Sequence, residues 1–68
     1  MTVRVGLVGA GGVGARHART LAGFDDVDLV AICDRVAASA EVLAREVDAR
    51  HVPDLTSLLT LGLDAVWL

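Results

Sequence analysis

Glycines occupy four of six consecutive positions in the part of this sequence that is best suited to chemistry. They lie in the run Gly9-Ala10-Gly11-Gly12-Val13-Gly14. An apolar segment leads directly into this run, and a segment with helical periodicity follows it. A Gly-x-Gly-x-x-Gly turn between a strand and a helix is typical of sites that hold the pyrophosphate of NAD or NADP. The turn therefore predicts a dinucleotide site.

The residues of this turn differ in the physical role that we expect of them. Gly9 permits a tight turn off the strand, and Gly14 permits the helix to pack closely on the strand. Gly11 has no Cβ, so a pyrophosphate can approach its backbone. The N–H groups of Gly12 and Val13 point at the phosphates. A turn that merely joins a strand to a helix is the alternative, but the position between a buried strand and a helix favours cofactor binding.

An acidic residue and a basic residue follow the second apolar segment. Asp34 lies 20 residues after Gly14, where a carboxylate can bind the adenosine ribose hydroxyls. It could equally serve as the N-cap of the next helix, and the two roles are compatible. Arg35 could pair with a 2′-phosphate, lie over the adenine, or be a solvated residue at the start of the helix. Because the carboxylate of Asp34 repels a 2′-phosphate, we expect NAD as cofactor, with NADP possible.

Four further side chains of chemical interest are expected to be structural. His17 lies on a core-facing helical stripe, beneath the phosphates, and His51 is expected at the surface. Cys33 is expected to be a small buried hydrophobe and Trp67 to belong to the core. The sequence shows no Ser/His/Asp set, metal-type Cys/His cluster or pair of carboxylates. No residue is therefore predicted to be catalytic or to bind a metal.

Hydrophobic periodicity predicts the elements that position these residues. Strands are expected at residues 2–8, 27–33, 50–52 and 63–68. Helices are expected at about 12–22 and 36–47, with a short third helix through Leu55, Leu58 and Leu59. Alternation of strands and helices with short links predicts a parallel sheet with right-handed crossovers. The fold class is therefore α/β, the first β-α-β-α-β-α-β portion of a Rossmann-like doubly wound parallel sheet.

The first of these helices has an apolar stripe that we expect to face the core. Its members Val13, His17, Leu21 and Phe24 are spaced as one face of a helix. Gly23 is placed to end this helix in a left-handed cap.

Length and composition limit the classes of protein to consider. The 68 residues are 54% hydrophobic and carry a formal net charge of −3, with six scattered arginines and no lysine. A nucleic-acid partner is not expected without a basic stripe, and no apolar run is long enough to span a membrane. With one cysteine and no signal peptide, we expect a soluble, cytoplasmic protein. We expect residues 1–68 to be the N-terminal part of a dinucleotide-binding domain, with the substrate domain outside this chain.

Several segments, in this order, resemble the start of the Gfo/Idh/MocA oxidoreductases. The first is Val5-Gly6-Leu7-Val8-Gly9-Ala10-Gly11-Gly12-Val13-Gly14-Ala15-Arg16-His17, with Leu21 beyond it. The others are Leu29-Val30-Ala31-Ile32-Cys33-Asp34-Arg35, the alanine-rich second helix, Asp54-Leu55 with Leu58-Leu59, and Leu63-Asp64-Ala65-Val66-Trp67-Leu68. The resemblance covers nearly all of the chain, and the ordered set is more specific than any one segment.

The resemblance implies an NAD(P)-dependent oxidoreductase that transfers hydride to or from a sugar, a cyclic polyol or a related hydroxy compound. Residues Gly9, Gly11, Gly12, Val13 and Gly14 would match its pyrophosphate turn, and Asp34 and Arg35 its adenosine end. Members of the family typically carry a second α/β domain that binds substrate and builds oligomers. We therefore expect the full-length protein to be a homo-oligomer.

The resemblance also implies catalytic groups that this chain lacks. Family members place a catalytic lysine in a Glu-Lys-Pro segment after the next strand, and a histidine further on commonly assists. This chain contains no lysine, and Leu68 precedes both positions. We therefore expect the 68 residues alone to catalyse nothing.

Two other functions use a similar turn. One alternative is a non-catalytic regulatory domain that senses NAD(H) without turning it over. The other is a flavoprotein, whose cofactor has the same adenosine half.

Overall fold

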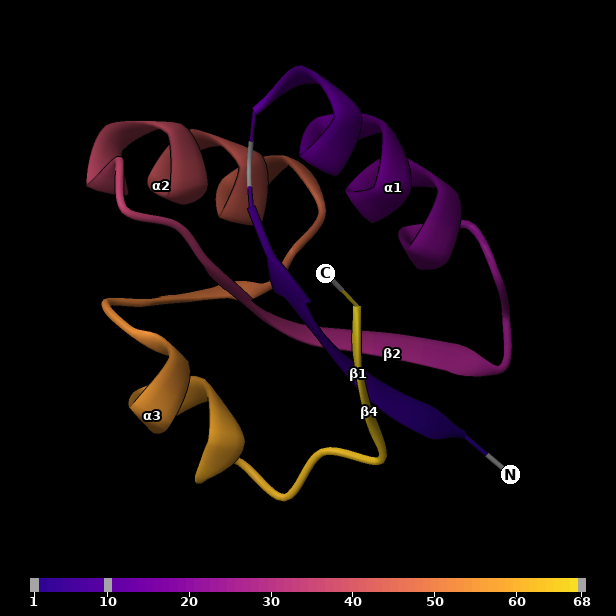
Figure 1. Cartoon of the computed structure of the whole chain (residues 1–68). Helices are drawn as coiled ribbons and strands as arrows, with labels where there is room; N and C mark the ends of the chain where they lie inside the picture. Colours follow the sequence, from indigo (N-terminus) through magenta and orange to yellow (C-terminus); the bar gives the residue numbers. More distant parts are fainter. Residues whose placement is uncertain (1, 10, 68) are drawn as a thin grey trace.

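Strands and helices alternate along the chain in the computed structural model, which describes residues 2–9 and 11–67 (Figure 1). The strands within this part are β1 (Val3–Val8), β2 (Val27–Cys33), β3 (Arg50–Val52) and β4 (Ala65–Trp67). The helices are α1 (Gly12–Ala22), α2 (Ala37–Glu46) and α3 (Leu55–Leu59). Ala10 of the glycine run and Leu68 of the last predicted strand lie outside the described residues. The predicted order of elements is confirmed.

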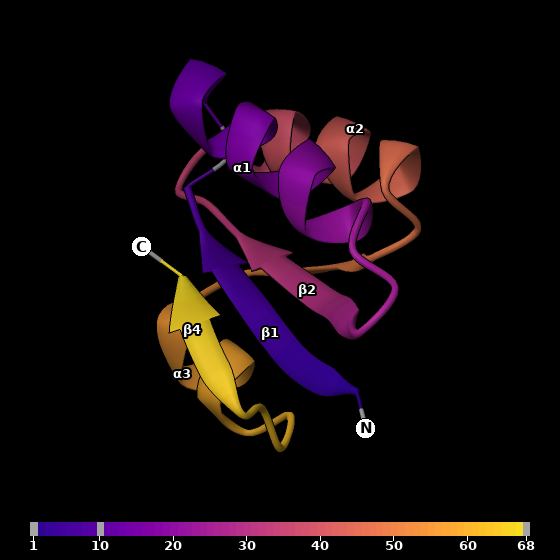
Figure 2. The same cartoon turned by 90° about the vertical axis from the view of Figure 1, so that its right-hand side faces the viewer.

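The strands form one parallel sheet in the order β3-β2-β1-β4. Helices α1 and α2 cover one face of this sheet, and α3 covers the other (Figure 1). β1 is flanked by β2 on one side and by β4 on the other, as Figure 2 shows. Since the chain changes direction across the sheet between β1 and β4, the topological switch point lies there. The predicted α/β, Rossmann-like, doubly wound fold is confirmed.

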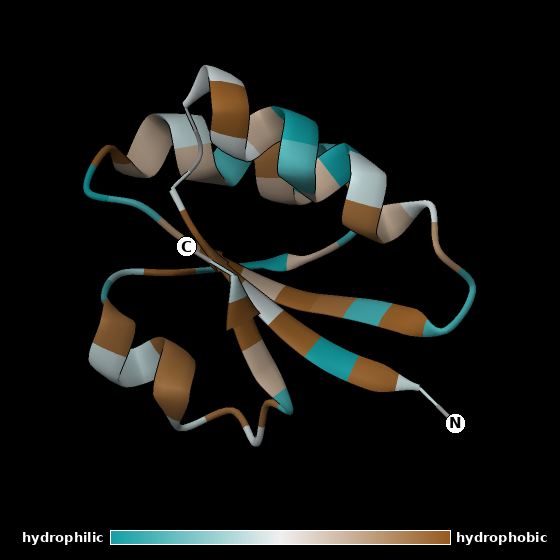
Figure 3. Ribbon diagram, turned by 45° about the vertical axis from the view of Figure 1, so that its right-hand side comes forward, coloured by the Kyte–Doolittle hydropathy of each residue, from teal (hydrophilic) through white to brown (hydrophobic). Residues whose placement is uncertain are grey.

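The sheet separates two hydrophobic clusters. On the side of α1 and α2, the fully buried Leu7 and Ile32 pack against Ala18 and Leu43. On the side of α3, the cluster is built around the fully buried Leu58. Figure 3 shows the hydrophobic residues that line the strands. Because both faces are covered, the central strands read as almost continuous apolar runs in the sequence.

One prediction for α1 is wrong, and a second is confirmed only in part. Gly23 follows the helix in a right-handed conformation (φ −80°, ψ −10°), so the predicted left-handed cap is absent. Val13 and Phe24 are 68% and 52% exposed, so the predicted stripe faces the core only in part, at Leu21. The buried residues of the helix are Ala18 and Leu21. Small side chains let α1 approach the sheet closely. This close packing, more than the spacing of the larger hydrophobic residues, decides which face of the helix is buried.

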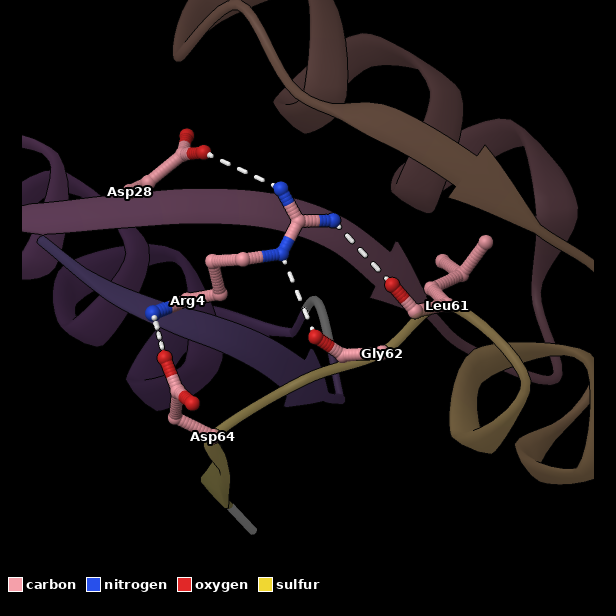
Figure 4. Close-up of polar contacts among 5 residues, drawn as sticks. All are labelled: Arg4, Asp28, Leu61, Gly62 and Asp64. Atoms are coloured by element: carbon pink, nitrogen blue, oxygen red, sulfur yellow. Dashed lines mark hydrogen bonds and ion pairs between the residues drawn. The ribbon is translucent and has the colours of Figure 1, made fainter.

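A network around Arg4 fixes β4 beside β1 (Figure 4). The Arg4 N–H donates to Asp64 Oδ2 at 2.8 Å, and the Asp64 N–H donates to the Arg4 carbonyl at 2.8 Å. The Arg4 guanidinium donates to the carbonyls of Leu61 and Gly62 at 3.1 and 3.2 Å, and it lies 3.8 Å from Asp28. These bonds hold the loop after α3 against β1. The network therefore sets the position of β4, which is one of the two strands that flank the switch point.

Replacing the guanidinium should weaken this attachment. We expect Arg4→Met to lower the free energy of unfolding by about 1–2 kcal/mol, since two hydrogen bonds to carbonyls are lost and the exposed ion pair contributes little. Urea denaturation measures the change. The control is Arg16→Met on the exposed surface of α1, which should stay within about 0.5 kcal/mol of the parent chain. If both variants lose the same free energy of unfolding, the Arg4 guanidinium does not hold the loop after α3 against β1.

Candidate functional site

The chain leaves β1 through a turn that only glycine adopts easily. Gly9 has φ +100°, a conformation that L side chains rarely take. Its N–H donates to the Cys33 carbonyl at 2.8 Å, which joins the turn to the end of β2. The tight turn predicted at Gly9 is therefore confirmed.

Gly14 packs directly against this turn. A Cβ added at Gly14 would lie 2.2 Å from the Gly9 carbonyl oxygen and 2.7 Å from the Gly9 carbonyl carbon. Both of these are backbone atoms, so no change of side-chain rotamer could relieve the contact. The close packing predicted at Gly14 is therefore confirmed.

Neither backbone conformation nor packing requires glycine at Gly11 or Gly12, the other two glycines of the turn. Gly11 has φ −68° and ψ −175°, which any residue can adopt. A Cβ added at Gly11 or at Gly12 would meet no atom within 4 Å, and both residues are exposed. The missing side chains leave an open space in front of the turn. A pyrophosphate that must approach the backbone fits this space.

The amino end of α1 lies at the same place. Gly11 is the N-cap, and the first helical hydrogen bond runs from the Ala15 N–H to the Gly11 carbonyl at 2.8 Å. The N–H groups of Gly12 and Val13 therefore belong to the first turn, where a helix offers donors and a partial positive charge to an anion. The first turn of α1 carries no acidic side chain. The local charge thus favours an anion beside the open space.

Asp34 lies next to the glycine turn, as its spacing predicts. Val8 and Cys33 are register partners on β1 and β2, so the residues that follow them leave the sheet side by side. Asp34 is half-buried, and its Oδ1 accepts a hydrogen bond from the Val36 N–H at 2.9 Å. The N-cap of α2 is Val36, so Asp34 stabilises the turn before the helix and is not its N-cap. Arg35 is exposed beside it.

Trp67 and His17 meet at the end of β4. Their ring centroids are 5.4 Å apart and the rings are tilted by 54°. His17 is half-buried in this packing contact, in agreement with its predicted structural role. Trp67 is 46% exposed, so its predicted place in the core is wrong. The pair was missed because 50 residues separate the two rings, and only the position of β4 beside β1 brings them together.

The remaining candidates form no reactive centre. Cys33 is buried as predicted, and burial raises the pKa of its thiol, which favours the neutral form. The His51 side chain is 21% exposed, so it is more buried than the predicted surface position implies, and its Nδ1 lies 3.9 Å from Glu41 Oε1. Within residues 2–9 and 11–67, no group of three His, Cys, Asp or Glu side chains could hold a metal. In the same ranges, no helix is long and apolar enough to cross a membrane.

The outer surface has a shallow hollow of about 400 Å³ between α1 and α2. Its charged lining residues, Arg19 and Glu46, form an ion pair with each other. The hydrogen bond from Arg19 lowers the pKa of the Glu46 carboxyl, so the pair stays charged and mutually satisfied. The glycine turn, at the switch point of the sheet, is therefore the better candidate for a binding site.

Comparison with known proteins identifies the family to which this chain is similar. A family model described as an oxidoreductase family with an NAD-binding Rossmann fold matches residues 3–68. An inositol 2-dehydrogenase of Rhizobium meliloti is 50% identical over 44 residues, which cover 65% of this chain and 13% of that protein. An inositol 2-dehydrogenase of Acidothermus cellulolyticus is 43% identical over 60 residues, which cover 85% of this chain and 18% of that protein.

A solved structure agrees with these relatives. The myo-inositol dehydrogenase from Lactobacillus casei, in complex with NAD(H) and myo-inositol, is 36% identical with a TM-score of 0.88. The match covers 97% of this chain and 21% of that one. The matched parts of this chain thus span between 13% and 21% of the length of these similar proteins.

Proposed function

The chain belongs to the Gfo/Idh/MocA oxidoreductase family, which has an NAD-binding Rossmann fold, and we propose that it is the cofactor-binding part of a dehydrogenase. The observation that carries this proposal is the open space at Gly11 and Gly12, in front of the amino end of α1. Gly9 and Gly14 have structural reasons to be glycine, whereas Gly11 and Gly12 have none without a ligand. A bound pyrophosphate supplies that reason.

Different residues around the turn bind different parts of the cofactor. In this proposal the backbone of Gly11, Gly12 and Val13 holds the pyrophosphate, and Gly9 and Gly14 shape the turn. The Asp34 carboxylate accepts hydrogen bonds from the adenosine ribose, and the exposed Arg35 lies toward the adenine. Hydride transfer is the chemistry that the nicotinamide supplies when it is bound. No residue of this chain is assigned to the proton transfer that accompanies it.

We propose a cyclic polyol as the substrate of the whole protein. The two relatives described above are named inositol 2-dehydrogenases, and the L. casei structure contains myo-inositol. These proteins are dehydrogenases, which favours an enzyme over a non-catalytic NAD(H) sensor. Residues 1–68 would then be the N-terminal part of the dinucleotide-binding domain, in a cytoplasmic homo-oligomer whose substrate domain lies outside this chain.

Calorimetric titration of this chain tests the proposal directly. We expect saturable binding of NAD, weaker binding of NADP, and no binding of FAD. Thermal unfolding should confirm the result, since a ligand that binds only the folded state raises the midpoint. If NAD gives neither heat nor a shift in the midpoint, the proposal is wrong. Tight binding of FAD, with flavin absorbance in the purified protein, would favour the flavoprotein instead.

The carboxylate of Asp34 should set affinity and selectivity. We expect Asp34→Ala to weaken NAD binding by about 1–3 kcal/mol, because the ribose hydroxyls lose a charged partner. The sharper variant is Asp34→Asn, which retains an oxygen to accept from the Val36 N–H but removes the charge. It should raise the affinity for NADP relative to NAD.

The matched control is Asp25→Ala, on the exposed loop after α1, which should change neither affinity. Calorimetry with both cofactors measures the ratio. If Asp34→Asn weakens NAD and NADP equally, Asp34 acts only on the turn before α2.

A further inference from the structure

Trp67 places a large aromatic surface at the switch point of the sheet. It is the register partner of Leu7, so it lies at the carboxyl end of β4, directly beside the strand that leads into Gly9. Neighbouring partners on parallel strands point to the same face, and Leu7 packs in the cluster with α1. Figures 1 and 2 both place the end of β4 beside the end of β1. The indole therefore lies on the α1 side of the sheet, close to the glycine turn.

His17 packs against this indole. It comes from α1, three residues after Gly14, so it belongs to the same helix whose amino end faces the open space. The 5.4 Å tilted contact fixes one side of the indole, and 46% of the residue stays exposed. The ring pair thus joins α1 to β4 below the turn, and in this chain part of Trp67 stays exposed.

The order of strands tells which half of a dinucleotide this surface would meet. Asp34 follows β2, on one side of β1, and Trp67 ends β4, on the other side. If the adenosine half lies at Asp34 and the pyrophosphate at the turn, the other half extends toward β4. A flat heteroaromatic ring stacks favourably on an exposed indole.

We propose that Trp67, positioned by His17, is a binding residue for the nicotinamide half of NAD. This inference rests on the proposed function, because it requires the adenosine half and the pyrophosphate to bind as described above. It assigns the second half of the ligand to a residue that the glycine motif does not include.

The chain offers a direct optical test, because it has one tryptophan and no tyrosine. Its intrinsic emission therefore reports on Trp67 alone. Oxidised NAD is the appropriate probe, since it does not absorb where indole emits. ADP-ribose has the same adenine and absorbs the same exciting light, so a larger loss of emission with NAD reports the nicotinamide. We expect saturating NAD to quench Trp67 strongly. ADP-ribose, which lacks the nicotinamide, should bind but change the emission little.

Variants at position 67 separate contact from folding. Trp67→Leu should weaken NAD binding about tenfold while ADP-ribose binds as in the parent chain, because only the stacking contact is lost. Trp67→Phe retains a ring and should restore most of the preference for NAD over ADP-ribose. His17→Ala should reduce the same preference, and His17→Phe, which keeps a ring against Trp67, should restore it.

Two outcomes overturn the inference in distinguishable ways. If NAD and ADP-ribose bind equally tightly and quench equally, the pyrophosphate site exists but Trp67 does not contact the nicotinamide. If neither ligand binds in calorimetry, the proposed function fails and this inference fails with it. A Trp67→Leu chain that keeps the parent preference for NAD also contradicts the inference.

Discussion

Gly14→Ala is expected to cost more stability than any other substitution considered for this chain. The new Cβ would lie 2.2 Å from the Gly9 carbonyl oxygen, so α1 must move away from the turn. Overpacking a core typically costs about 1–3 kcal/mol, and here both sides of the contact are backbone, which favours the upper end. A chain of 68 residues has little stability in reserve. We therefore expect a loss of about 3 kcal/mol and a largely unfolded population at 37 °C.

Far-UV circular dichroism during urea and thermal unfolding measures this loss. The matched control is Gly12→Ala, where the new Cβ meets nothing within 4 Å. Because alanine restricts the unfolded chain at a helical position, this variant should gain about 0.4–1 kcal/mol. Two glycines only two residues apart should thus respond with opposite signs. If the two variants unfold alike, the close approach of α1 to Gly9 is not rigid.

Local patterns in the sequence were enough to predict the elements and the turn. Alternating and helical periods predict strands and helices whose bounds agree with the structure to within a few residues. The three roles of the glycine spacing follow from backbone sterics, and two of them, at Gly9 and Gly14, are visible in the structure. The position of Asp34 beside the turn follows from the length of one β-α-β unit. These features depend on residues that are near in sequence.

Packing between distant segments was not predictable in the same way. The face that α1 turns to the sheet is decided by the close approach at Gly14 and by the small, buried Ala18, not by the larger Val13 or Phe24. The contact of His17 with Trp67 requires β4 to pair with β1, which no local period specifies.

An irregularity in the β1–β2 pairing is a second feature that local patterns in the sequence do not predict. Val5 pairs with Leu29, but Gly6 pairs with Ala31, so β2 has one extra residue there. A Cβ added at Gly6 would lie 2.6 Å from a Leu63 methyl and 2.9 Å from a Leu58 methyl. Gly6 therefore lets α3 and the loop after it approach the sheet. In the sequence this glycine looks like one more small residue in a strand.

Gly11→Thr is expected to abolish most NAD binding while the fold is retained. Gly11 is the N-cap of α1 in an extended conformation, and threonine and glycine are about equally good N-caps. No atom lies within 4 Å of the new Cβ, so the free energy of unfolding should change by no more than about 0.5 kcal/mol. The branched side chain would nevertheless fill the space in front of the first helical turn. Its hydroxyl can also accept from the N–H groups that are proposed to hold the phosphates.

The loss should be about 100-fold in affinity, because hydrogen bonds to a charged group are each worth about 1.5–3 kcal/mol. Calorimetric titration with NAD and with ADP-ribose measures it, and both ligands should be affected since they share the pyrophosphate. The matched control is Asp54→Thr, which places the same residue at the N-cap of α3, on the opposite face of the sheet. Asp54 now caps that helix by accepting from the Ser57 N–H at 2.7 Å, a bond that threonine can replace. Undiminished binding in Gly11→Thr would show that no ligand approaches this backbone, and the open space at Gly11 and Gly12 would then carry no function.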